Sequence, residues 1–475
     1  MTTAARQYID GELTESEMFE QAFNPATGKS LGEFSDGTAG DARAAVDAAR
    51  GAFETTDWAS NRQVRSRVLM NMADLLEARS DEFIRALSRD NGKTLEQARF
   101  ELSVSVPKLR YYAAAALTET GHASETAPGL IQRSVAEPVG IAGVIVPWNS
   151  PIVLSIRSFA PALAAGCTVA MKLPPQTAMV NGLLHQLFAD TSDLPRGVIN
   201  SVTESGNHLA ELLTTSPHVA AVSYTGSAKV GRTIMANSAP HLKKLSLELG
   251  GKTPMMIFSD ADLDAAVPVL VQGITTFTGQ FCMAGSRILV HESRAEELSK
   301  RLVAALDAVT VGAGDENGVD MGPMIDAANA SRVDRTVQTA IDNGSATALR
   351  RGGQQGDTAF YSPSLLAVAD VGAGIVQEEV FGPVATFETF SSDDEAVSKA
   401  NATEYGLAAS IWTRDVDRPS RVGRRIKAGT IWTNTWAVVT DSFEEGGFKQ
   451  SGLGRLNGLG ALAEFQEIKT YTQQL

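Results

Sequence analysis

Cysteine is scarce in this chain, and basic residues do not outnumber acidic ones. Only two cysteines occur among 475 residues, Cys167 and Cys282, which excludes a disulfide scaffold and suits the reducing cytoplasm. The 41 Lys and Arg residues face 55 Asp and Glu residues, so the net charge is -14. With no basic surplus to displace counterions, we expect no nucleic-acid partner and no anchoring on an anionic membrane.

Long apolar segments are also missing. The first residues contain no apolar core of a secretory signal, so we expect no signal peptide. The uncharged stretch between Arg157 and Lys172 is too short to span a bilayer, and residues 265–286 are interrupted by Pro268 and by Gln, Gly and Thr residues. We interpret this second stretch as a buried helix that runs into a loop.

Several catalytic motifs are absent as well. No Walker A loop precedes Lys252 or Lys93, because Ser246 and Leu87 stand where its first glycine is needed. There is no G-x-S-x-G elbow, and the six histidines lack metal-ligand spacing and have no cysteine pair near them. The sequence therefore predicts neither a P-loop enzyme, nor a hydrolase of that type, nor a metal site.

Core-forming residues, in contrast, are abundant. Hydrophobic residues make up 43% and charged residues 20% of the chain, a balance typical of large buried cores. The length suggests about three domains. Apolar residues at i, i+3, i+4 spacing predict helices in the first third of the chain, at residues 41–53, 64–78, 80–88 and 94–118.

Two runs of alternating strands and helices follow. From Val139, short apolar strands alternate with helices, which indicates βαβ units and a parallel sheet covered on both faces. A second alternation begins after Gly251 and predicts a second α/β domain, with a helix at residues 262–278. Sheets of this kind bind ligands at the carboxyl ends of their strands.

Two segments fit neither run. Residues 121–138 are rich in Gly, Pro, Ser and Thr around an alternating piece, which predicts a hairpin. Residues 467–472 near the end of the chain alternate like a strand. Because an unpaired strand edge is a liability, we expect this tail strand to pair with the 121–138 segment or with a neighbouring subunit.

An amide and a glycine turn stand out in the first α/β run. Asn149 comes just past a buried strand, where it could donate to a developing oxyanion or could simply be a turn residue before Pro151. Residues 223–231 predict a strand, a glycine turn and a helix start, in which Gly226 and Gly231 would let the backbone approach a pyrophosphate. The same spacing also suits an ordinary strand-to-helix turn.

A carboxylate and a thiol come next along the chain. Glu248 lies in an apolar stretch; burial would suit it to act as a general base, and a solvated strand residue is the alternative. Cys282 follows a glycine turn at the end of a helix, where a thiolate would be a strong nucleophile. A buried inert thiol is the alternative, and Cys167 fits it well.

Taken together and in this order, these motifs resemble the aldehyde dehydrogenase superfamily. The resemblance covers essentially the whole chain, and it extends to Lys172 after its strand, to residues 378–384, to Asn434 and to residues 446–452. It implies a Rossmann-like nucleotide-binding domain, a second α/β catalytic domain and a small β oligomerisation element. We place these at residues 1–118 with 139–250, at 251–450, and at 119–138 with 451–475, in a homodimer or homotetramer.

The resemblance also implies a hydrolytic mechanism. Cys282 would attack the aldehyde carbon to give a thiohemiacetal, whose oxyanion is held by the Asn149 amide and the Cys282 backbone N–H. Loss of hydride to the nicotinamide of NAD or NADP would leave a thioester, and Glu248 would activate the water that hydrolyses it. Glu248 could also help to deprotonate Cys282.

Contacts to the cofactor carry over residue by residue. The resemblance places Trp148 and Lys172 at the adenosine half, and Phe381 near the nicotinamide ring. Further contacts are implied for Gly226, Ser227 and Gly231 at the pyrophosphate and for Glu379 at the nicotinamide ribose. One departure is Pro175, which stands where many NAD-preferring members have a Glu for the adenosine ribose hydroxyls. We therefore expect NADP to be accepted, alongside NAD.

The substrate end holds a second departure. Glu444 and Glu445 stand where the family usually has Pro-Phe, near the mouth of the substrate tunnel. Arg157, eight residues after Asn149, either contacts an anionic or polar end of the substrate or pairs with one of these two acids. Candidates for an apolar tunnel wall are Phe281, Met283, Trp436 and Phe443.

These features predict an aromatic aldehyde or a carboxylated semialdehyde as the substrate. A coenzyme A-acylating aldehyde dehydrogenase is one alternative, although Glu248 favours hydrolysis of the thioester. A non-catalytic oligomeric scaffold with the same fold is the other alternative, against which the intact set of Asn149, Glu248 and Cys282 argues.

Overall fold

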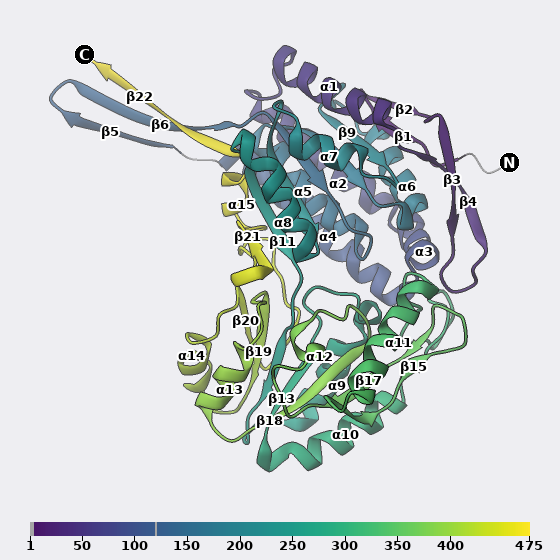
Figure 1. Cartoon of the computed structure of the whole chain (residues 1–475). Coiled ribbons are helices and arrows are strands. Elements are labelled where there is room, and N and C mark those ends of the chain that lie inside the picture. The colour runs from purple at the N-terminus through teal and green to yellow at the C-terminus, as the bar shows by residue number, and fades with distance from the viewer. Residues whose placement is uncertain (1–3, 119–120) are drawn as a thin grey trace.

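Two large sheets organise the computed structural model, which describes residues 4–118 and 121–475 (Figure 1). The first sheet has the strand order β2-β1-β9-β8-β7-β10-β11-β21, and its five central strands from β9 to β11 are parallel. Its strands are β1 (Gln7–Ile9), β2 (Glu12–Thr14), β7 (Ile141–Ile145), β8 (Thr168–Leu173), β9 (Ile199–Thr203), β10 (Val219–Gly226), β11 (Lys244–Leu249) and β21 (Gly452–Leu453).

Helices cover both faces of this first sheet. One face packs against α2 (Arg62–Ala78), α3 (Ser80–Asn91), α4 (Leu95–Thr118), α5 (Pro151–Ala165) and α6 (Ala178–Asp190). The other face packs against α1 (Ala39–Thr55), α7 (His208–Thr215) and α8 (Ala228–Ser238). Successive residues of β7 enter opposite cores, which is why its sequence is an unbroken apolar run rather than an alternating one.

The second sheet has the order β14-β17-β18-β13-β12-β19-β20, and it is parallel except for the edge pair β14–β17. Its strands are β12 (Pro254–Ile257), β13 (Arg287–His291), β14 (Thr347–Arg350), β17 (Ser364–Ala367), β18 (Val384–Phe390), β19 (Ala408–Trp412) and β20 (Thr430–Thr433). One face packs on α9 (Leu263–Thr275) and α10 (Ala295–Asp307). The remaining helices are α11 (Ala327–Asp342), α12 (Gly374–Gln377), α13 (Asp393–Ala400) and α14 (Arg418–Gly423).

A three-stranded antiparallel sheet extends away from this body as a thin arm (Figure 1). It consists of β5 (His122–Ala127), β6 (Leu130–Pro138) and the tail strand β22 (Gln466–Gln474). The hairpin predicted at 121–138 is confirmed where the structure describes it, and the tail strand pairs with β6 along its whole length, as expected. Residues 452–465 lie instead on the first sheet and its helices, through β21 and α15 (Gly460–Ala463).

Several hairpins, most of them near the N-terminus, were not expected from the sequence. Besides β1 and β2, the strands β3 (Met18–Phe23) and β4 (Ser30–Asp36) form a hairpin, and a small one joins β15 (Gly353–Gln354) to β16 (Tyr361–Ser362). Five of the six residues of β3 are exposed, so no apolar alternation marks this strand. None of the described helices is long and apolar enough to cross a membrane.

The helix predicted at 262–278 is shorter in the structure. It ends with α9 at Thr275, and Phe277 and Thr278 then adopt left-handed conformations with φ of 51° and 55°. Gly279 follows with φ of 67°, where an added Cβ would lie 2.2 Å from the carbonyl oxygen of Gly382. This tight turn follows the end of the helix, which lies seven residues before Cys282, and leads the chain into the loop that carries the thiol.

A buried ion pair joins two strands next to that loop. Arg287 on β13 donates to both carboxylate oxygens of Glu388 on β18 at 2.9 and 2.7 Å, and both side chains are buried. Arg287→Met should lower the free energy of unfolding by about 3–5 kcal/mol, because it leaves a buried carboxylate without its partner. Denaturant unfolding measures this loss. The double variant Arg287→Met/Glu388→Leu should recover most of it, and equal losses in the single and double variants would contradict the account.

Candidate active site

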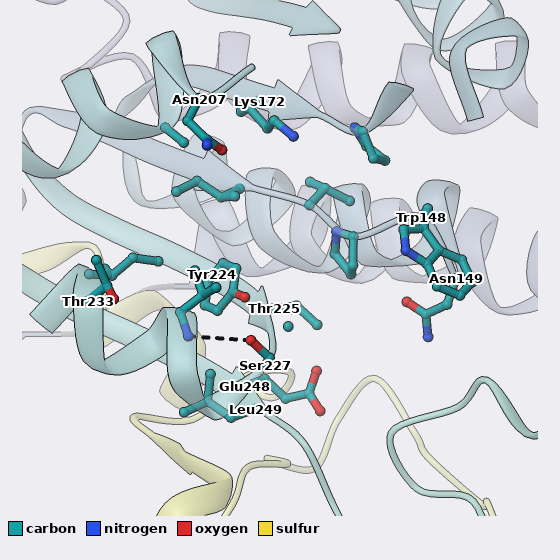
Figure 2. A pocket seen from close by; sticks show the side chains of 18 of the residues that line it. Trp148, Asn149, Lys172, Asn207, Tyr224, Thr225, Ser227, Thr233, Glu248 and Leu249 are labelled. Atoms are coloured by element: carbon teal, nitrogen blue, oxygen red, sulfur yellow. Dashed lines mark hydrogen bonds between the residues drawn. The ribbon is translucent and has the colours of Figure 1, made fainter. Parts of the chain in front are cut away.

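A cavity of about 740 Å³ opens at the carboxyl ends of the parallel strands β7, β8, β10 and β11. Figure 2 shows Lys172 and Asn207 on one side of it, Ser227 and Glu248 on the other, and Trp148 at one end. This is the edge at which open α/β sheets bind their ligands. The size and the strand-end position suit a dinucleotide.

The turn between β10 and α8 forms the floor of this cavity. Ser227 caps α8, because its hydroxyl accepts a hydrogen bond from the N–H of Val230 at 3.3 Å (Figure 2). A Cβ on Gly226 would lie 2.2 Å from the Tyr224 hydroxyl, so only glycine fits there. Gly231 does not reach the cavity; it is buried against Leu249 and lets α8 pack closely on β11. The free N–H groups at the helix start suit an anionic ligand group.

Three further predicted residues line the same cavity. Glu379 accepts the Gly251 N–H at 3.1 Å, and burial raises the pKa of its carboxyl to about 7. Phe381 has a left-handed backbone conformation. Its ring packs edge-to-face with the Trp148 ring, with 5.6 Å between the ring centroids. Burial lowers the pKa of Lys172, which partly offsets its attraction for anions.

A second cavity, of about 480 Å³, lies beside the first. Its walls are largely apolar and include three of the four candidates for a tunnel wall, Phe281, Met283 and Trp436. Phe281 meets the rings of Phe277 and Trp436 edge-on at 5.6 and 5.8 Å. Phe443 was expected in this wall, but its side chain is 71% exposed and it does not line the cavity.

Asn149 and Cys282 line both cavities. The Asn149 side-chain amide donates to the backbone carbonyl of Gln280 at 3.1 Å, which ties the end of β7 to the loop that holds the thiol. An amide nitrogen carries two N–H groups, so one remains for a further acceptor. The structure therefore brings the predicted oxyanion donor and the predicted nucleophile to one junction.

A buried network holds Asn149 in place from behind. Glu101 on α4 accepts the N–H groups of Ile152 and Val153 at 2.9 and 3.2 Å, at the start of α5. Lys93 donates to Glu101 and to the Ser150 hydroxyl and lies over a phenylalanine ring. Because a carboxylate at a helix N-terminus satisfies free N–H groups, this contact fixes the backbone that directly follows Asn149.

The Cys282 thiol is half-buried and favours its protonated form. Burial, together with the negative charge of Glu248, raises the pKa of this thiol well above the usual value, against the opposing influence of Arg157. Cys167 is fully buried and lines neither cavity, and its thiol donates to the Phe465 carbonyl at 3.2 Å. The two cysteines thus separate into a cavity thiol and a structural one.

Arg157 lies between Glu248 and Glu445. Its guanidinium donates to Glu248 at 2.7 Å, to the Thr225 hydroxyl at 2.9 Å and to Glu445 at 2.6 Å. Two roles were considered for Arg157, a contact with the substrate and a pair with Glu444 or Glu445. The structure shows the pair, and its partner is Glu445. The second Glu248 oxygen, Oε1, has no hydrogen-bond partner among the described residues. Glu248 itself lines the first cavity beside Cys282.

Some site residues were not found from the sequence. Arg332 lines the first cavity, and its positive charge acts on Glu379, although nothing in the helical pattern of residues 327–343 distinguishes it from a solvated arginine. Glu444 accepts the Gly460 N–H and does not line the second cavity, so only Glu445 of the two acids reaches it. Glutamates in a loop are normally solvated, so the local sequence could not predict which of Glu444 and Glu445 reaches the cavity.

A doubly wound sheet with a strand-end cavity that meets an apolar tunnel at a thiol defines a nucleotide-dependent oxidoreductase. The chain belongs to the aldehyde dehydrogenase family, whose model matches residues 13–471. Membership confirms the predicted fold class and the predicted enzyme class, an oxidoreductase that acts on aldehydes with NAD or NADP.

Similar proteins cover the chain almost completely. The 2-aminomuconic semialdehyde dehydrogenase of Danio rerio is 35% identical over 98% of this chain and 97% of its own length. The phenylacetaldehyde dehydrogenase of Pseudomonas fluorescens is 37% identical over 96% of this chain and 93% of its own length. A crystal structure of betaine aldehyde dehydrogenase from Staphylococcus aureus in complex with NAD+ has a TM-score of 0.96 at 33% identity, and covers 100% of this chain and 95% of that one.

The raised pKa of Cys282 predicts how the thiol reacts with an alkylating agent. In the cofactor-free protein, the rate of alkylation of Cys282 by iodoacetamide should rise with pH through a midpoint above the ordinary thiol value of about 8.5. Glu248→Gln removes a negative charge beside the thiol and should move the midpoint to lower pH. Peptide mass spectrometry follows Cys282, with buried Cys167 as the internal control. A plateau below pH 8 in the unaltered protein, or an upward shift in the variant, would contradict this assignment.

Proposed function

We propose that this protein oxidises an uncharged aldehyde with an apolar, aromatic body to the carboxylic acid, through a thioester on Cys282. The observation that carries the proposal is that Asn149 and Cys282 line both the strand-end cavity and the apolar one. A carbonyl carbon bound at this junction lies within reach of a thiol, an amide donor and a nucleotide site at once.

The first cavity fits a dinucleotide. Gly226 leaves room for a close approach to the backbone, and the start of α8 offers N–H groups to a pyrophosphate. Lys172 would hold the adenosine ribose, and Glu379 would accept hydrogen bonds from the nicotinamide ribose. Bound NAD or NADP supplies the acceptor for the hydride that leaves the substrate carbon.

The residues of the junction would divide the chemistry. Cys282, after giving up its proton to Glu248, forms a C–S bond to the aldehyde carbon, and the oxyanion is held by the Asn149 amide and the Cys282 backbone N–H. When the carbon has lost its hydride, a thioester remains. Glu248 passes the thiol proton to solvent and then takes a proton from a water that attacks the thioester; as the C–S bond breaks, this second proton goes to the sulfur, the acid leaves and the thiol is restored. The unpaired Glu248 Oε1 is the atom left for this water.

The second cavity favours an uncharged substrate over a carboxylated one. Two cations are among its described lining residues, Lys108 and Arg157. Lys108 pairs with Asp441 at 2.5 Å, and Arg157 pairs with Glu445 and Glu248. A substrate carboxylate would thus meet cations that already have partners, whereas an aromatic ring would pack among Phe277, Phe281 and Trp436. Of the two substrate classes predicted from the sequence, the aromatic aldehyde is therefore the one we propose.

The projecting sheet is our candidate for the oligomerisation element. Every residue of β5 is exposed, Ile468 in β22 is 68% exposed, and Leu475, which directly follows β22, is 75% exposed. An edge strand with exposed apolar side chains is a suitable surface for a second copy. We propose a homodimer or homotetramer built through this sheet. We likewise propose that the nucleotide-binding part is built on the first large sheet, the catalytic part on the second large sheet, and the oligomerisation part on the projecting three-stranded sheet.

Product analysis tests the proposed reaction. With 4-methylbenzaldehyde and NAD+ or NADP+, the protein should form 4-methylbenzoate and reduced nicotinamide in equal amounts, at a rate that coenzyme A does not change. Cys282→Ala should abolish the reaction, whereas Cys167→Ala should retain it. An acyl-coenzyme A product would favour the acylating alternative, and no reduced nicotinamide with any aromatic aldehyde would contradict the proposal.

Pro175 predicts that NADP+ is accepted as well as NAD+. It lines the first cavity together with Lys172, at a place where a carboxylate would repel the 2′-phosphate of NADP. We expect kcat/KM for NADP+ to lie within about tenfold of that for NAD+. Pro175→Glu should lower kcat/KM for NADP+ at least about tenfold more than for NAD+. A strict requirement for NAD+ in the unaltered protein would rule this preference out.

A further inference from the structure

Three charged side chains from distant parts of the chain meet in a buried ion-pair cluster, of which Arg157 and Glu445 line the apolar cavity. Arg157 comes from α5, Glu248 from β11 and Glu445 from the loop between β20 and β21. Their side chains are 6%, 1% and 6% exposed. One positive charge thus faces two negative charges in a largely dry site. Removing these charges from water costs free energy, and one negative charge is left without a cation of its own.

Both terminal nitrogens of the Arg157 guanidinium have acceptors, whereas Nε has none among the described residues. The Nη2 group is taken by Glu248 and the Thr225 hydroxyl, and the Nη1 group is taken by Glu445. Burial opposes the charge of Arg157, but Glu445 and Glu248 raise its pKa above the usual value. Because Glu248 lines only the first cavity and Glu445 only the second, Nη1 is the side of the guanidinium that a substrate would approach.

The backbone holds Glu445 firmly in this place. Its N–H donates to the Leu456 carbonyl and its carbonyl accepts the Leu456 N–H, both at 2.8 Å. The neighbouring Glu444 turns the other way and accepts the Gly460 N–H at 3.0 Å. The carboxylate of Glu445 is thus a fixed part of the cavity wall.

We propose that Glu445 is a specificity-determining residue: its carboxylate occupies the position on Arg157 Nη1 that a substrate carboxylate would need, and so excludes aldehydes that carry an acidic group. This inference rests on the proposed function, since it concerns the substrate of the same site. An acidic aldehyde would have to displace a carboxylate that is already paired and desolvated, and would face its negative charge until it did. A neutral aldehyde pays neither cost.

A pair of aldehydes of matched shape tests the proposal. We would measure kcat/KM for 4-carboxybenzaldehyde and for 4-methylbenzaldehyde, and take the ratio of the first to the second. Glu445→Ala opens Nη1 and should raise the ratio at least about thirtyfold. Glu445→Gln keeps the size and an acceptor while removing the charge, and should raise it by a smaller factor. Glu445→Asp keeps the charge and should leave the ratio close to that of the unaltered protein.

The double variant Glu445→Ala/Arg157→Met locates the effect. Arg157 also contacts Glu248, so its loss lowers turnover of both aldehydes, but a common loss cancels in the ratio. The gain made by Glu445→Ala should disappear in the double variant. An unchanged ratio in both Glu445→Ala and Glu445→Gln, or a gain that survives the loss of Arg157, would overturn the proposal.

A binding measurement separates this inference from the proposed function. If the unaltered protein converts no aromatic aldehyde, the proposed function fails, whatever Glu445 does. Calorimetric titration with terephthalate and with 4-methylbenzoate needs no turnover: Glu445→Ala should strengthen terephthalate binding relative to 4-methylbenzoate at least about tenfold. If the affinity for terephthalate relative to 4-methylbenzoate were the same before and after the substitution, the role of Glu445 would be contradicted and the proposed function would not.

Discussion

The hydrogen bond from the Asn149 amide to the Gln280 carbonyl is the contact on which the site depends. Asn149 lies in the loop between β7 of the first sheet and α5, and Gln280 lies two residues before Cys282 in the loop that follows α9. Because this contact ties the segment after β7 to the loop that carries the thiol, it helps to set where the thiol stands relative to both cavities. The left-handed turn at Phe277, Thr278 and Gly279 directs the loop toward it from one side. The Lys93–Glu101 pair secures it from the other.

Charge within the site is arranged in pairs, and this pairing links catalysis to substrate choice. Glu248 raises the pKa of the Cys282 thiol and at the same time accepts a hydrogen bond from Arg157. Arg157 in turn is held by Glu445, which faces the substrate side. The base, the thiol and the tunnel wall are therefore parts of one electrostatic unit. A substitution of Glu445 is therefore expected to change substrate binding more than it changes the pKa of the Cys282 thiol.

The sequence predicted those parts of the fold whose cause is local. Apolar periodicity marked helices such as α2 and the buried strand β7, because each follows from a repeat within a few residues. The alternating tail strand and the 121–138 hairpin were expected to pair, and they do so. Strand β3 was not predicted, because most of its residues are exposed and its sequence shows no buried face. The motifs around Asn149 and Cys282 gave the site and left two roles open for Arg157, a substrate contact or a pair with Glu444 or Glu445. The local sequence could not decide between them, since Glu445 lies 288 residues away and loop glutamates are normally solvated.

The covalent step at Cys282 is the central event of the proposed reaction. Mass spectrometry of the Glu248→Gln protein, quenched in acid after brief mixing with NAD+ and 4-methylbenzaldehyde, observes that step directly. Since the residue proposed to activate water is missing, an acyl group should accumulate, and the Cys282 peptide should carry the added mass of a 4-methylbenzoyl thioester. Cys282 unmodified while aldehyde is oxidised, or the acyl group found on Cys167, would contradict the central claim.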